Sequence, residues 1–423
     1  MNGILVYGLG RSGLGVLGYL KQHAVTAHFY DDRLLAEEAA KAQSLGFQPD
    51  TDLSGSYRQV IAAPGVPIDH PNLLRLRAAG AEVIGEAELV YRSSKTPIIG
   101  ITGTAGKTSC TLFTAHFLKA LGFAAAVGGN IDPPLASVVD EAEVVSTELS
   151  SFQLERVVSF RPRVAVLLML GVDHLDRHGS LEAYHAAKFN LIKNLTAEDA
   201  LVYNARDSRI VAGIRGNPAK LHPFEPADNP RETNLRAAEQ AAIAYAEIVR
   251  REQPQRALDL RPETFDLRPH WKTAPHPEAR YELFAKIGGL SFIDDSIATR
   301  IDAVRMALEA APAPVGWILG GVDKGAPAEE LRALVAQKVG LIFAIGRDGA
   351  KLAEPFGGLS EIVEIAEKDG RKALEQVVEI AKARLEGGSV LLAPLATSFD
   401  QFKDYKDRSK VFREVVKAAG GKP

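Results

Sequence analysis

The residues best suited to chemistry follow an apolar run, in the stretch TPIIGITGTAGKTSCTLF (96–113). Its glycines let backbone N–H groups approach a polyphosphate, and a helix beginning near Lys107 turns its positive dipole end toward the same anion. Lys107 adds a positive charge, and Thr108 adds a hydroxyl group suited to Mg²⁺. The stretch therefore predicts a strand, a phosphate loop and a helix that bind a nucleotide, although the first glycine of the usual G-x-x-x-x-G-K-[ST] pattern stands one residue early.

A second glycine motif opens the chain. GLGRSG (8–13) satisfies G-x-G-x-x-G after a predicted strand, and Asp31 stands 23 residues after Gly8, as in folds that bind nicotinamide cofactors. The same geometry holds any nucleotide diphosphate at a helix N-terminus, so the motif indicates a pyrophosphate more firmly than it indicates NAD. Together the two motifs suggest a nucleotide-bearing substrate and an energy source, with an oxidoreductase as the alternative.

Polar residues also follow the next two apolar strands. Glu148 ends the strand in VVSTELSSFQLE (144–155), and His174 and Asp176 follow the strand after it, in GVDHLDRHG (171–179). Ligands of parallel sheets collect beyond the carboxyl ends of strands, so Glu148 and His174 are expected to converge on the phosphate loop and to hold Mg²⁺ there. His174 taken alone also fits a loop histidine that pairs with a neighbour.

Lys188 stands 14 residues beyond His174, on a predicted helix that Ser180 can cap. By position alone it is a surface lysine. Further along the chain, SFIDDSIATR (291–300), GGVDKG (320–325) and APLATSFDQF (393–402) place more polar groups after strands. Each stretch could be an ordinary connection between a strand and a helix, but three such stretches on one sheet edge favour a shared binding face.

Short β-branched runs alternate with helical stretches along most of the chain, which predicts parallel sheets covered by helices. We expect an α/β protein of three domains: a Rossmann-like domain at 1–94, a central parallel-sheet domain like that of P-loop ATPases at 95–278, and a second Rossmann-like domain at 279–423. A helix is predicted over 231–252. The stretch 254–277, with five prolines, is expected to connect the last two domains.

The composition limits the partners and the compartment. Lys and Arg total 50 against 53 Asp and Glu, a net charge of −3 over 423 residues, which argues against nucleic acid or an anionic membrane surface as the main partner. The single cysteine, Cys110, allows no intrachain disulfide and suits a reducing compartment. No apolar run reaches the roughly 18 residues of a membrane span. We therefore expect a soluble, cytoplasmic monomer.

Several passages resemble the Mur ligase family, and the likeness covers essentially the whole chain in the same order. The most specific passages are STELSSFQLE, DHLDRHGSLEAYHAAK, ILGGVDKG and APLATSFDQFKDYKDRSKVF. Within the family the chain looks like the members that add D-glutamate to UDP-N-acetylmuramoyl-L-alanine. The resemblance implies an ATP-dependent ligase of peptidoglycan precursor synthesis that uses Mg²⁺ and an acyl-phosphate intermediate.

The resemblance also implies roles for individual residues. The UDP-sugar substrate is expected to contact Arg11, Ser12, Asp31, Asp32, Gly65 and Asn130. ATP is expected to contact Gly103, Gly106, Lys107, Thr108, Ser109, Asn234, Arg280 and Asp295. Thr108, Glu148, His174 and a carbamylated Lys188 are expected to hold Mg²⁺, with Lys107, His174 and Lys188 as catalytic residues. D-Glutamate is expected at Thr299, Lys324, Ser398, Phe399 and Tyr405.

Some positions depart from the family pattern. Five positions carry another residue where the family usually has a polar one: Ala105, Met169, Gly171, Arg231 and Ala279. At Arg231 the usual residue is Asn. DDSIATR (294–300) stands where N-D-S-K-A-T-N is usual, so Ile297 removes a cation from the acceptor side and Arg300 is the residue that could restore it. A related ligase with another amino-acid acceptor, or a non-catalytic protein that binds UDP-sugar and ATP, is therefore the alternative. Because the phosphate-loop and metal residues all remain, we expect an active ligase.

Overall fold

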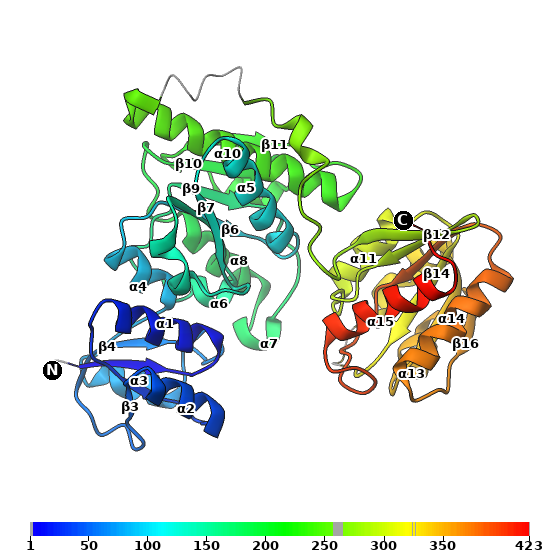
Figure 1. Ribbon diagram of the computed structural model, residues 1–423, viewed down its shortest axis with the longest axis horizontal. Coiled ribbons are helices and arrows are strands. Elements are labelled where there is room, and N and C mark those ends of the chain that lie inside the picture. Colours follow the sequence, from blue (N-terminus) through cyan, green and yellow to red (C-terminus); the bar gives the residue numbers. More distant parts are fainter. Residues whose placement is uncertain (1–2, 257–264, 324, 326, 423) are drawn as a thin grey trace. The chain divides into compact units, whose positions relative to one another are not determined.

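The computed structural model describes residues 3–256, 265–323, 325 and 327–422. Over these residues helices pack along three β-sheets (Figure 1), which confirms the predicted α/β fold with parallel-sheet domains. The segments Met1–Ala227 and Glu232–Pro275 form one compact unit, which contains the first two sheets. The segments Asp228–Arg231 and His276–Pro423 form a second unit, which contains the third sheet. The predicted domain boundaries at 94/95 and 278/279 stay predictions.

The first sheet is parallel, with the strand order β3-β2-β1-β4-β5. Its strands are β1 (Gly3–Tyr7), β2 (His28–Tyr30), β3 (Gln48–Pro49), β4 (Tyr57–Ala62) and β5 (Glu82–Ile84), and its helices are α1 (Arg11–Gln22), α2 (Ala36–Ser44), α3 (Pro71–Ala78) and α4 (Glu86–Ser93). The glycine motif GLGRSG forms the turn between β1 and α1. Gly8 has a φ of +93°, and a Cβ atom at Gly13 would lie 1.9 Å from the carbonyl oxygen of Gly8. Both positions therefore require glycine, the first for the turn and the second for the close packing of α1 on β1.

The second sheet is also parallel, in the order β11-β10-β9-β6-β8-β7. Its strands are β6 (Ile98–Thr102), β7 (Ala125–Gly129), β8 (Val144–Glu148), β9 (Val164–Leu167), β10 (Ala200–Asn204) and β11 (Lys220–Phe224). The helices are α5 (Lys107–Ala120), α6 (Ser151–Leu154), α7 (Leu175–His178), α8 (Leu181–Phe189), α9 (Ser208–Gly213) and α10 (Pro230–Glu252), the last confirming the predicted helix. Helices α5 and α10 cover one face of the sheet.

The other face of this sheet shares its apolar core with the first sheet. Leu20 of α1 and Val90 of α4 belong to the same buried cluster as Val145 of β8, Leu154 of α6 and Leu191 beyond α8. Burial of apolar surface across this junction explains why the first two sheets form one compact unit.

A buried carboxylate adds a polar tie at the same junction. Glu88 of α4 accepts hydrogen bonds from the backbone N–H groups of Val158, Ser159 and Phe160 at 2.8–2.9 Å, and from the Ser159 hydroxyl at 2.5 Å. The Arg92 guanidinium donates to the same carboxylate at 2.6 Å. Charge-assisted bonds of this kind are stronger than neutral ones, so Glu88 fixes α4 against the turn that precedes β9.

We expect the Glu88 tie to make stability depend on pH. Burial alone raises the pKa of Glu88, but the donors from Ser159, Val158 and Phe160 outweigh it and hold the pKa below its ordinary value of 4.5. The stabilisation is therefore complete above pH 4.5 and is lost as the pH falls through the folded-state pKa. Urea unfolding of the wild type and of Glu88→Gln should differ most near neutral pH and converge on acidification. A difference that grows toward low pH would contradict this account.

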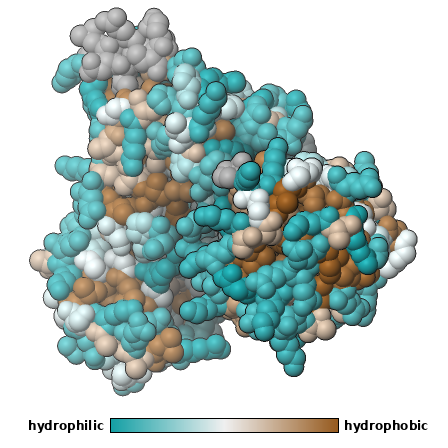
Figure 2. Space-filling model, turned by 45° about the vertical axis from the view of Figure 1, so that its right-hand side comes forward, coloured by the Kyte–Doolittle hydropathy of each residue, from teal (hydrophilic) through white to brown (hydrophobic). Residues whose placement is uncertain are grey.

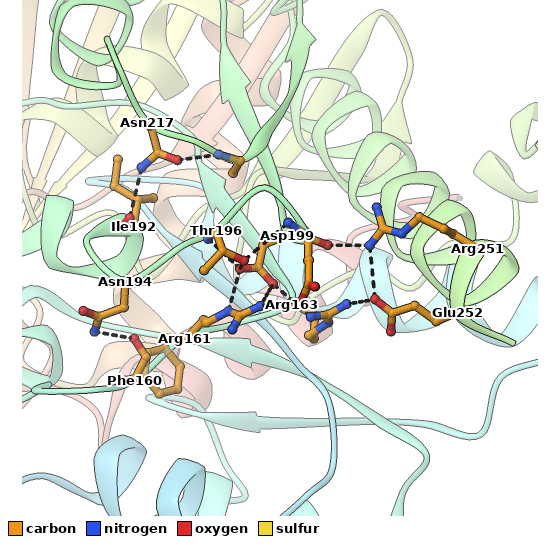
Figure 3. A network of polar contacts seen from close by, with 12 residues as sticks. Phe160, Arg161, Arg163, Ile192, Asn194, Thr196, Asp199, Asn217, Arg251 and Glu252 are labelled. Atoms are coloured by element: carbon orange, nitrogen blue, oxygen red, sulfur yellow. Dashed lines mark hydrogen bonds and ion pairs between the residues drawn. The ribbon is translucent and has the colours of Figure 1, made fainter.

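A second polar network lies at the amino-terminal ends of β9 and β10 (Figure 3). The Asp199 carboxylate, with no exposed side-chain surface, accepts from Arg161 Nε at 2.6 Å and from Arg163 Nη1 at 3.1 Å. Arg163 also pairs with Glu252 at the end of α10, and the backbone N–H of Thr196 donates to Asp199 at 2.8 Å. The network joins the start of the sheet to the end of α10, away from the carboxyl ends of the strands.

Replacing Asp199 with asparagine is expected to destabilise the protein by about 3 kcal/mol, because two half-buried arginines lose their shared counter-charge. Chemical denaturation measures the change. Glu198→Gln is the matched control, because Glu198 pairs with the same Arg161 at 3.3 Å but its side chain is 70% exposed. We expect the control to change stability by less than about 1 kcal/mol. Equal losses for the two variants would show that burial of Asp199 is not the cause.

The third sheet has the order β12-β13-β17-β14-β15-β16. Its strands are β12 (Glu282–Ile287), β13 (Leu290–Asp294), β14 (Val315–Gly320), β15 (Val339–Ile345), β16 (Glu361–Glu364) and β17 (Gly388–Leu392); β12 pairs antiparallel with β13, and the other pairs are parallel. The helices are α11 (Ile301–Ala310), α12 (Arg332–Lys338), α13 (Gly349–Ala353), α14 (Gly370–Arg384) and α15 (Tyr405–Ala418). Helices α14 and α15 cover one face, and α11 to α13 cover the other.

Among the residues that the structure describes, no helix has the length and apolar character to cross a membrane. Hydrophilic and hydrophobic side chains are interspersed on the face drawn in Figure 2.

Candidate active site

The stretch 96–113 forms the predicted strand, loop and helix. Strand β6 ends at Thr102, and α5 begins at Lys107 with Gly106 as its N-cap in the left-handed conformation (φ +82°). A Cβ atom at Gly106 would lie 2.4 Å from the Asn234 side-chain oxygen, and one at Gly103 would lie 2.9 Å from Leu168 Cβ. The loop is thus closely packed and needs both glycines, and the predicted ATP residue Asn234 lies directly against it.

Two predicted site residues meet at the start of α5. The Thr108 hydroxyl donates to one carboxylate oxygen of Glu148, and the Asn130 side-chain amide donates to the other at 2.9 Å. Glu148 ends β8 and is only 3% exposed. Ser109 lies half-buried one residue further along α5. The structure therefore brings Thr108, Glu148 and Asn130 together. The approach of Glu148 to the phosphate loop was predicted, whereas its contact with Asn130 was not.

Two lysines converge on one backbone carbonyl of the phosphate loop. Lys107 Nζ donates to the carbonyl oxygens of Gly103 at 2.9 Å and Thr104 at 3.1 Å, and Lys188 Nζ donates to the Gly103 oxygen at 2.8 Å. Lys188 lies on α8, which Ser180 caps as predicted by accepting from the Ala183 N–H at 3.1 Å. The two lysines of the predicted catalytic set thus share a single contact.

The expectation that Lys188 lies on the surface by its position is wrong, because the residue is only 1% exposed. Its Nζ atom lies 4.5 Å from the centre of the Tyr184 ring. Burial, followed by the positive charge of Lys107, holds the pKa of Lys188 well below its usual value of 10.5, while the Glu148 carboxylate acts in the opposite direction. A buried lysine with a lowered pKa is a candidate for chemistry that needs an unprotonated amine.

His174 lies on the other side of the loop, after β9. Its Nε2 atom is 3.3 Å from the Asp173 carboxylate, and its ring centre is 4.6 Å from that of Phe152. The strand order β9-β6-β8 places His174 and Glu148 at the carboxyl ends of the two strands that flank β6. The connection after β9 also contacts the phosphate loop, since the Thr104 N–H donates to the Met169 carbonyl at 2.9 Å. His174 and Glu148 thus both lie on the side of the sheet where the strands have their carboxyl ends, as the sequence predicted.

These residues fit a magnesium–nucleotide site. Over the described part of the chain, no three His, Cys, Asp or Glu side chains form a group that could hold a metal ion without other ligands. Mg²⁺, however, is usually bound by one or two protein oxygens together with substrate phosphates and water. The Thr108 hydroxyl and the Glu148 carboxylate, in contact at the start of α5, supply such oxygens.

A cavity of about 580 Å³ lies between the first two sheets of the same unit. All six residues predicted to contact the UDP-sugar line it: Arg11, Ser12, Asp31, Asp32, Gly65 and Asn130. The glycine turn after β1, the loop after β4 and the end of β7 form its walls. Sequence motifs more than 100 residues apart, at Arg11 and Asn130, therefore share one cavity, and Arg11 donates to the Asn130 carbonyl at 3.4 Å.

Hydrogen bonds hold the cavity residues in place. The Asp31 carboxylate accepts from the N–H groups of Leu9 at 2.7 Å and Arg33 at 2.8 Å, which fixes the glycine turn. Asp32 accepts from the Tyr7 hydroxyl at 2.8 Å. The Ser12 hydroxyl donates at 2.5 Å to Glu86, whose pKa is raised by its complete burial.

The second unit carries the residues predicted for D-glutamate. The stretches that follow β13, β17 and β14 leave the same edge of the sheet, because these three parallel strands are neighbours. The Leu395 N–H donates to the Ala298 carbonyl at 3.0 Å, and the Val322 N–H donates to the Thr397 carbonyl at 2.8 Å. The three stretches therefore share one edge of the sheet within this unit, and binding at that edge stays a prediction.

The predicted acceptor residues differ in exposure along this face. Ser398 is 3% exposed, Phe399 is 71% exposed, and Thr299 and Tyr405 are half-buried. Lys324 lies outside the described residues. Buried Arg408 of α15 joins the stretches after β13 and β17, since it donates to the Ser296 carbonyl at 2.8 Å and to the Ala396 carbonyl at 3.3 Å.

Two residues predicted for ATP also belong to the second unit. Asp295 follows β13, and burial raises its pKa to about 7, while the Tyr281 N–H and the charge of Arg280 act in the opposite direction. Arg280 is half-buried and follows Ala279, which is fully buried with a φ of +58°. Of the unusual residues, Ile297 is half-buried, and Arg300 is exposed as the N-cap of α11.

Comparison with known proteins identifies the family. The MurD-like N-terminal domain of Mur ligases matches residues 2–85, and the Mur ligase middle domain matches residues 101–246. A UDP-N-acetylmuramoylalanine–D-glutamate ligase of Thermus thermophilus is 61% identical over 419 residues, which cover 99% of this chain and 98% of the relative. The chain belongs to the Mur ligase family. A protein of the same name from Deinococcus radiodurans is 42% identical over 443 residues, covering 99% of this chain and 92% of the relative.

Solved structures of Mur ligases share the fold. UDP-N-acetylmuramate-alanine ligase MurC of Thermotoga maritima matches with a TM-score of 0.53 at 19% identity, over 99% of this chain and 100% of that chain. A pseudomurein peptide ligase type C of Methanothermus fervidus matches with a TM-score of 0.57 at 16% identity and the same coverage. At these identities the likeness supports the Mur ligase fold alone.

The sequence interpretation missed several residues of the site. Arg33, His70 and Gln153 line the cavity, and Thr104 accepts from the Gly171 N–H at 2.8 Å and from the Tyr184 hydroxyl at 3.2 Å. Gln153 had a sequence signal, since Ser150 and Gln153 have the S-x-x-Q spacing of a capping box and form one. The others have no local signal, because distant segments bring them to the site.

Proposed function

We propose that this chain joins D-glutamate to UDP-N-acetylmuramoyl-L-alanine with hydrolysis of ATP to ADP and phosphate. The observation that carries the proposal is the 61% identity over 99% of the chain to a ligase of that name. The geometry supports it, because the first unit combines a phosphate loop with a separate cavity lined by a second nucleotide motif. Membership of the family decides against the oxidoreductase that GLGRSG alone allowed.

In this proposal the UDP end of the substrate occupies the cavity. The N-terminus of α1 follows the glycine turn and offers backbone N–H groups to the diphosphate, and Arg11 adds a positive charge there. Asp31, Asp32 and Gly65 follow β2 and β4, the two strands that flank β1, and are proposed to contact the uridine. Asn130 connects the two sites, because it lines the cavity and its side-chain amide also contacts Glu148 at 2.9 Å.

The phosphate loop is proposed to hold ATP. The N–H groups at the start of α5 face the phosphates, with Gly106 allowing the close approach, and Lys107 neutralises charge on the transferring phosphoryl group. Lys107 Nζ donates to the Gly103 and Thr104 carbonyl oxygens, which keeps its charge at the phosphate loop. Ser109 and Asn234 complete this side, and Arg280 and Asp295 are the residues proposed from the second unit.

The reaction needs two transfers. A carboxylate oxygen of the L-alanyl group attacks the γ-phosphorus of ATP, the bond to the bridging oxygen breaks, and ADP leaves with its electrons. The amine of D-glutamate then attacks the acyl carbon, a proton is lost from nitrogen, and inorganic phosphate leaves. Most of the catalysis is positioning and charge neutralisation, since the protein forms no covalent bond to the substrates.

Mg²⁺, when bound, would neutralise charge on the phosphate oxygens. Thr108 and Glu148 are proposed to hold it, together with His174 and Lys188. An ammonium would repel the ion, whereas a Lys188 carbamate presents anionic oxygens. The lowered pKa of Lys188 supports this assignment, because an unprotonated amine is the form that combines with CO₂.

D-Glutamate is proposed to bind on the second unit, at Thr299, Ser398, Phe399 and Tyr405, with Lys324 as the cation for its side-chain carboxylate. Ile297 and Arg300 favour a second candidate, a Mur ligase with another amino-acid acceptor, because they change the charge on the acceptor side. We further propose that the chain acts in the cytoplasm as a monomer, without nucleic acid or membrane as a partner.

Isotope transfer tests the proposed chemistry. UDP-N-acetylmuramoyl-L-alanine with ¹⁸O in its free carboxylate is incubated with ATP, Mg²⁺ and D-glutamate. Because the attacking oxygen leaves with the phosphate, one ¹⁸O atom should appear in each phosphate released. Unlabelled phosphate would rule out an acyl phosphate, and no release from the complete mixture would favour a non-catalytic binding protein.

A further inference from the structure

Arg177 links the cavity to the helix that follows His174. Its Nη2 atom donates to the carbonyl oxygens of Val66 at 3.0 Å and Pro64 at 3.3 Å, and Nη1 lies 3.5 Å from the Gly65 oxygen. Residues 64–66 follow β4 and line the cavity. Arg177 belongs to α7, which begins directly after His174. A single guanidinium therefore spans three consecutive carbonyl groups of the cavity wall.

The Arg177 side chain is itself held on both sides. Glu155 pairs with Arg177 Nη2 at 3.2 Å, and the Phe152 ring lies 4.7 Å below the guanidinium carbon. The same Glu155 contacts His178 Nδ1 at 3.1 Å, and His178 Nε2 lies 3.0 Å from the Ser151 hydroxyl. The Phe152 ring that supports Arg177 also packs on His174. Helices α6 and α7 thus form one polar and aromatic cluster around Glu155.

We propose that Arg177 is a positioning residue that fixes the cavity wall at residues 64–66 relative to His174, and so sets the position of the UDP-sugar substrate relative to the phosphate loop. The inference rests on the proposed function, because it assigns the cavity to that substrate. Arg177 does not line the cavity and its side chain is 14% exposed, so it acts through the wall and not by contact with the ligand.

The contacts explain why arginine is needed at this position. A planar guanidinium offers several donors in fixed directions, whereas a lysine ammonium on the same helix could not serve the carbonyl groups and Glu155 together. Arg156 also donates to the Val66 carbonyl, so the wall keeps one anchor when Arg177 is changed. Replacing Arg177 should therefore displace the wall without unfolding the unit.

The experiment compares three full-length variants with the wild type. Arg177→Lys removes the planar guanidinium with its several donors, and Glu155→Gln removes the ionic partner of Arg177. Arg161→Lys is the matched control, because Arg161 is also a half-buried arginine with two carboxylate partners, but it lies in the Asp199 network. Calorimetry without ATP measures the Kd of UDP-N-acetylmuramoyl-L-alanine, steady-state kinetics measure KM for this substrate and for ATP, and thermal unfolding reports stability.

For Arg177→Lys we expect the Kd and KM of the UDP-sugar substrate to rise by about tenfold or more, since small displacements of a binding wall are costly, while KM for ATP changes less than about twofold. Glu155→Gln should shift the same constants in the same direction by a smaller factor. Arg161→Lys should lower the unfolding temperature without changing either constant.

An unchanged Kd in folded Arg177→Lys would overturn the inference, as would an equal rise in Arg161→Lys or an equal rise in KM for ATP. If Arg177→Lys does not fold, the Kd of Glu155→Gln decides the question alone. A wild-type protein that does not bind the UDP-sugar substrate would instead refute the proposed function, so the two failures are distinct.

Discussion

Lys107→Ala is expected to lower ATP turnover by about a thousandfold or more, because the charge that neutralises the transferring phosphoryl group is lost. Binding of UDP-N-acetylmuramoyl-L-alanine should remain within about twofold of the wild type, since Lys107 does not line the cavity of the first glycine motif. Coupled phosphate release measures the first effect, and calorimetry measures the second.

Lys119→Ala is the control for this variant, because Lys119 lies exposed in the last turn of the same helix α5. It should leave both quantities unchanged. Loss of UDP-sugar binding in Lys107→Ala would contradict separate sites for the two nucleotides. Retained turnover would remove Lys107 from the catalytic set.

The second large effect is expected at Lys188. Replacing it with methionine keeps an unbranched side chain of similar volume but removes the amine, and should lower turnover by about a thousandfold if the carbamate oxygens are needed in the site. Stability should hold or increase, because a buried amine is replaced by an apolar group of similar volume. Activity assays and thermal unfolding separate these two effects.

Carbamylation is tested directly with ¹³C-labelled CO₂ and NMR. A carbamate signal is expected in the wild type, and it should weaken as the pH falls, because protonation of the amine competes with CO₂ even at the lowered pKa of Lys188. The signal should be absent from Lys188→Met. It should be present in Lys193→Met, which replaces an exposed lysine five residues further along the chain. Full activity in Lys188→Met would contradict the assignment.

Local sequence patterns predicted the parts of the site that depend on neighbouring residues. The phosphate loop, the glycine turn after β1 and the Ser180 cap of α8 each arise from residues within one turn of each other, so spacing alone indicates them. The position of Glu148 and His174 on one side of the sheet also followed, because both were predicted to come at or after the carboxyl ends of parallel strands. These features need no information about distant packing.

The burial of Lys188 could not be predicted in the same way. The amine is enclosed because α8 brings it to the Gly103 carbonyl, 85 residues away in sequence. Arg177, Glu155 and Glu88 are charged residues on or directly after short helices, and each has partners on another element. Charged side chains at such positions usually face solvent, so their pattern gave no sign of a structural role.

Short strands at or near the sheet edges were also missed. The β3 strand has two residues, Gln48 and Pro49, and β11 contains Pro223, which cannot donate to a sheet ladder. The β16 strand, EIVE, alternates polar and apolar residues over only four positions. Edge strands gain most of their stability from the neighbouring strand, so their own sequences carry a weak signal.

The most direct test of the account is phosphate release with ATP, Mg²⁺ and UDP-N-acetylmuramoyl-L-alanine across a panel of D- and L-amino acids, with the mass of each product determined. We predict release and a product of the expected mass only with D-glutamate, which would mean that Ile297 and Arg300 are tolerated on the acceptor side. Turnover with a different amino acid would contradict the proposed function, and so would the absence of turnover with every amino acid of the panel.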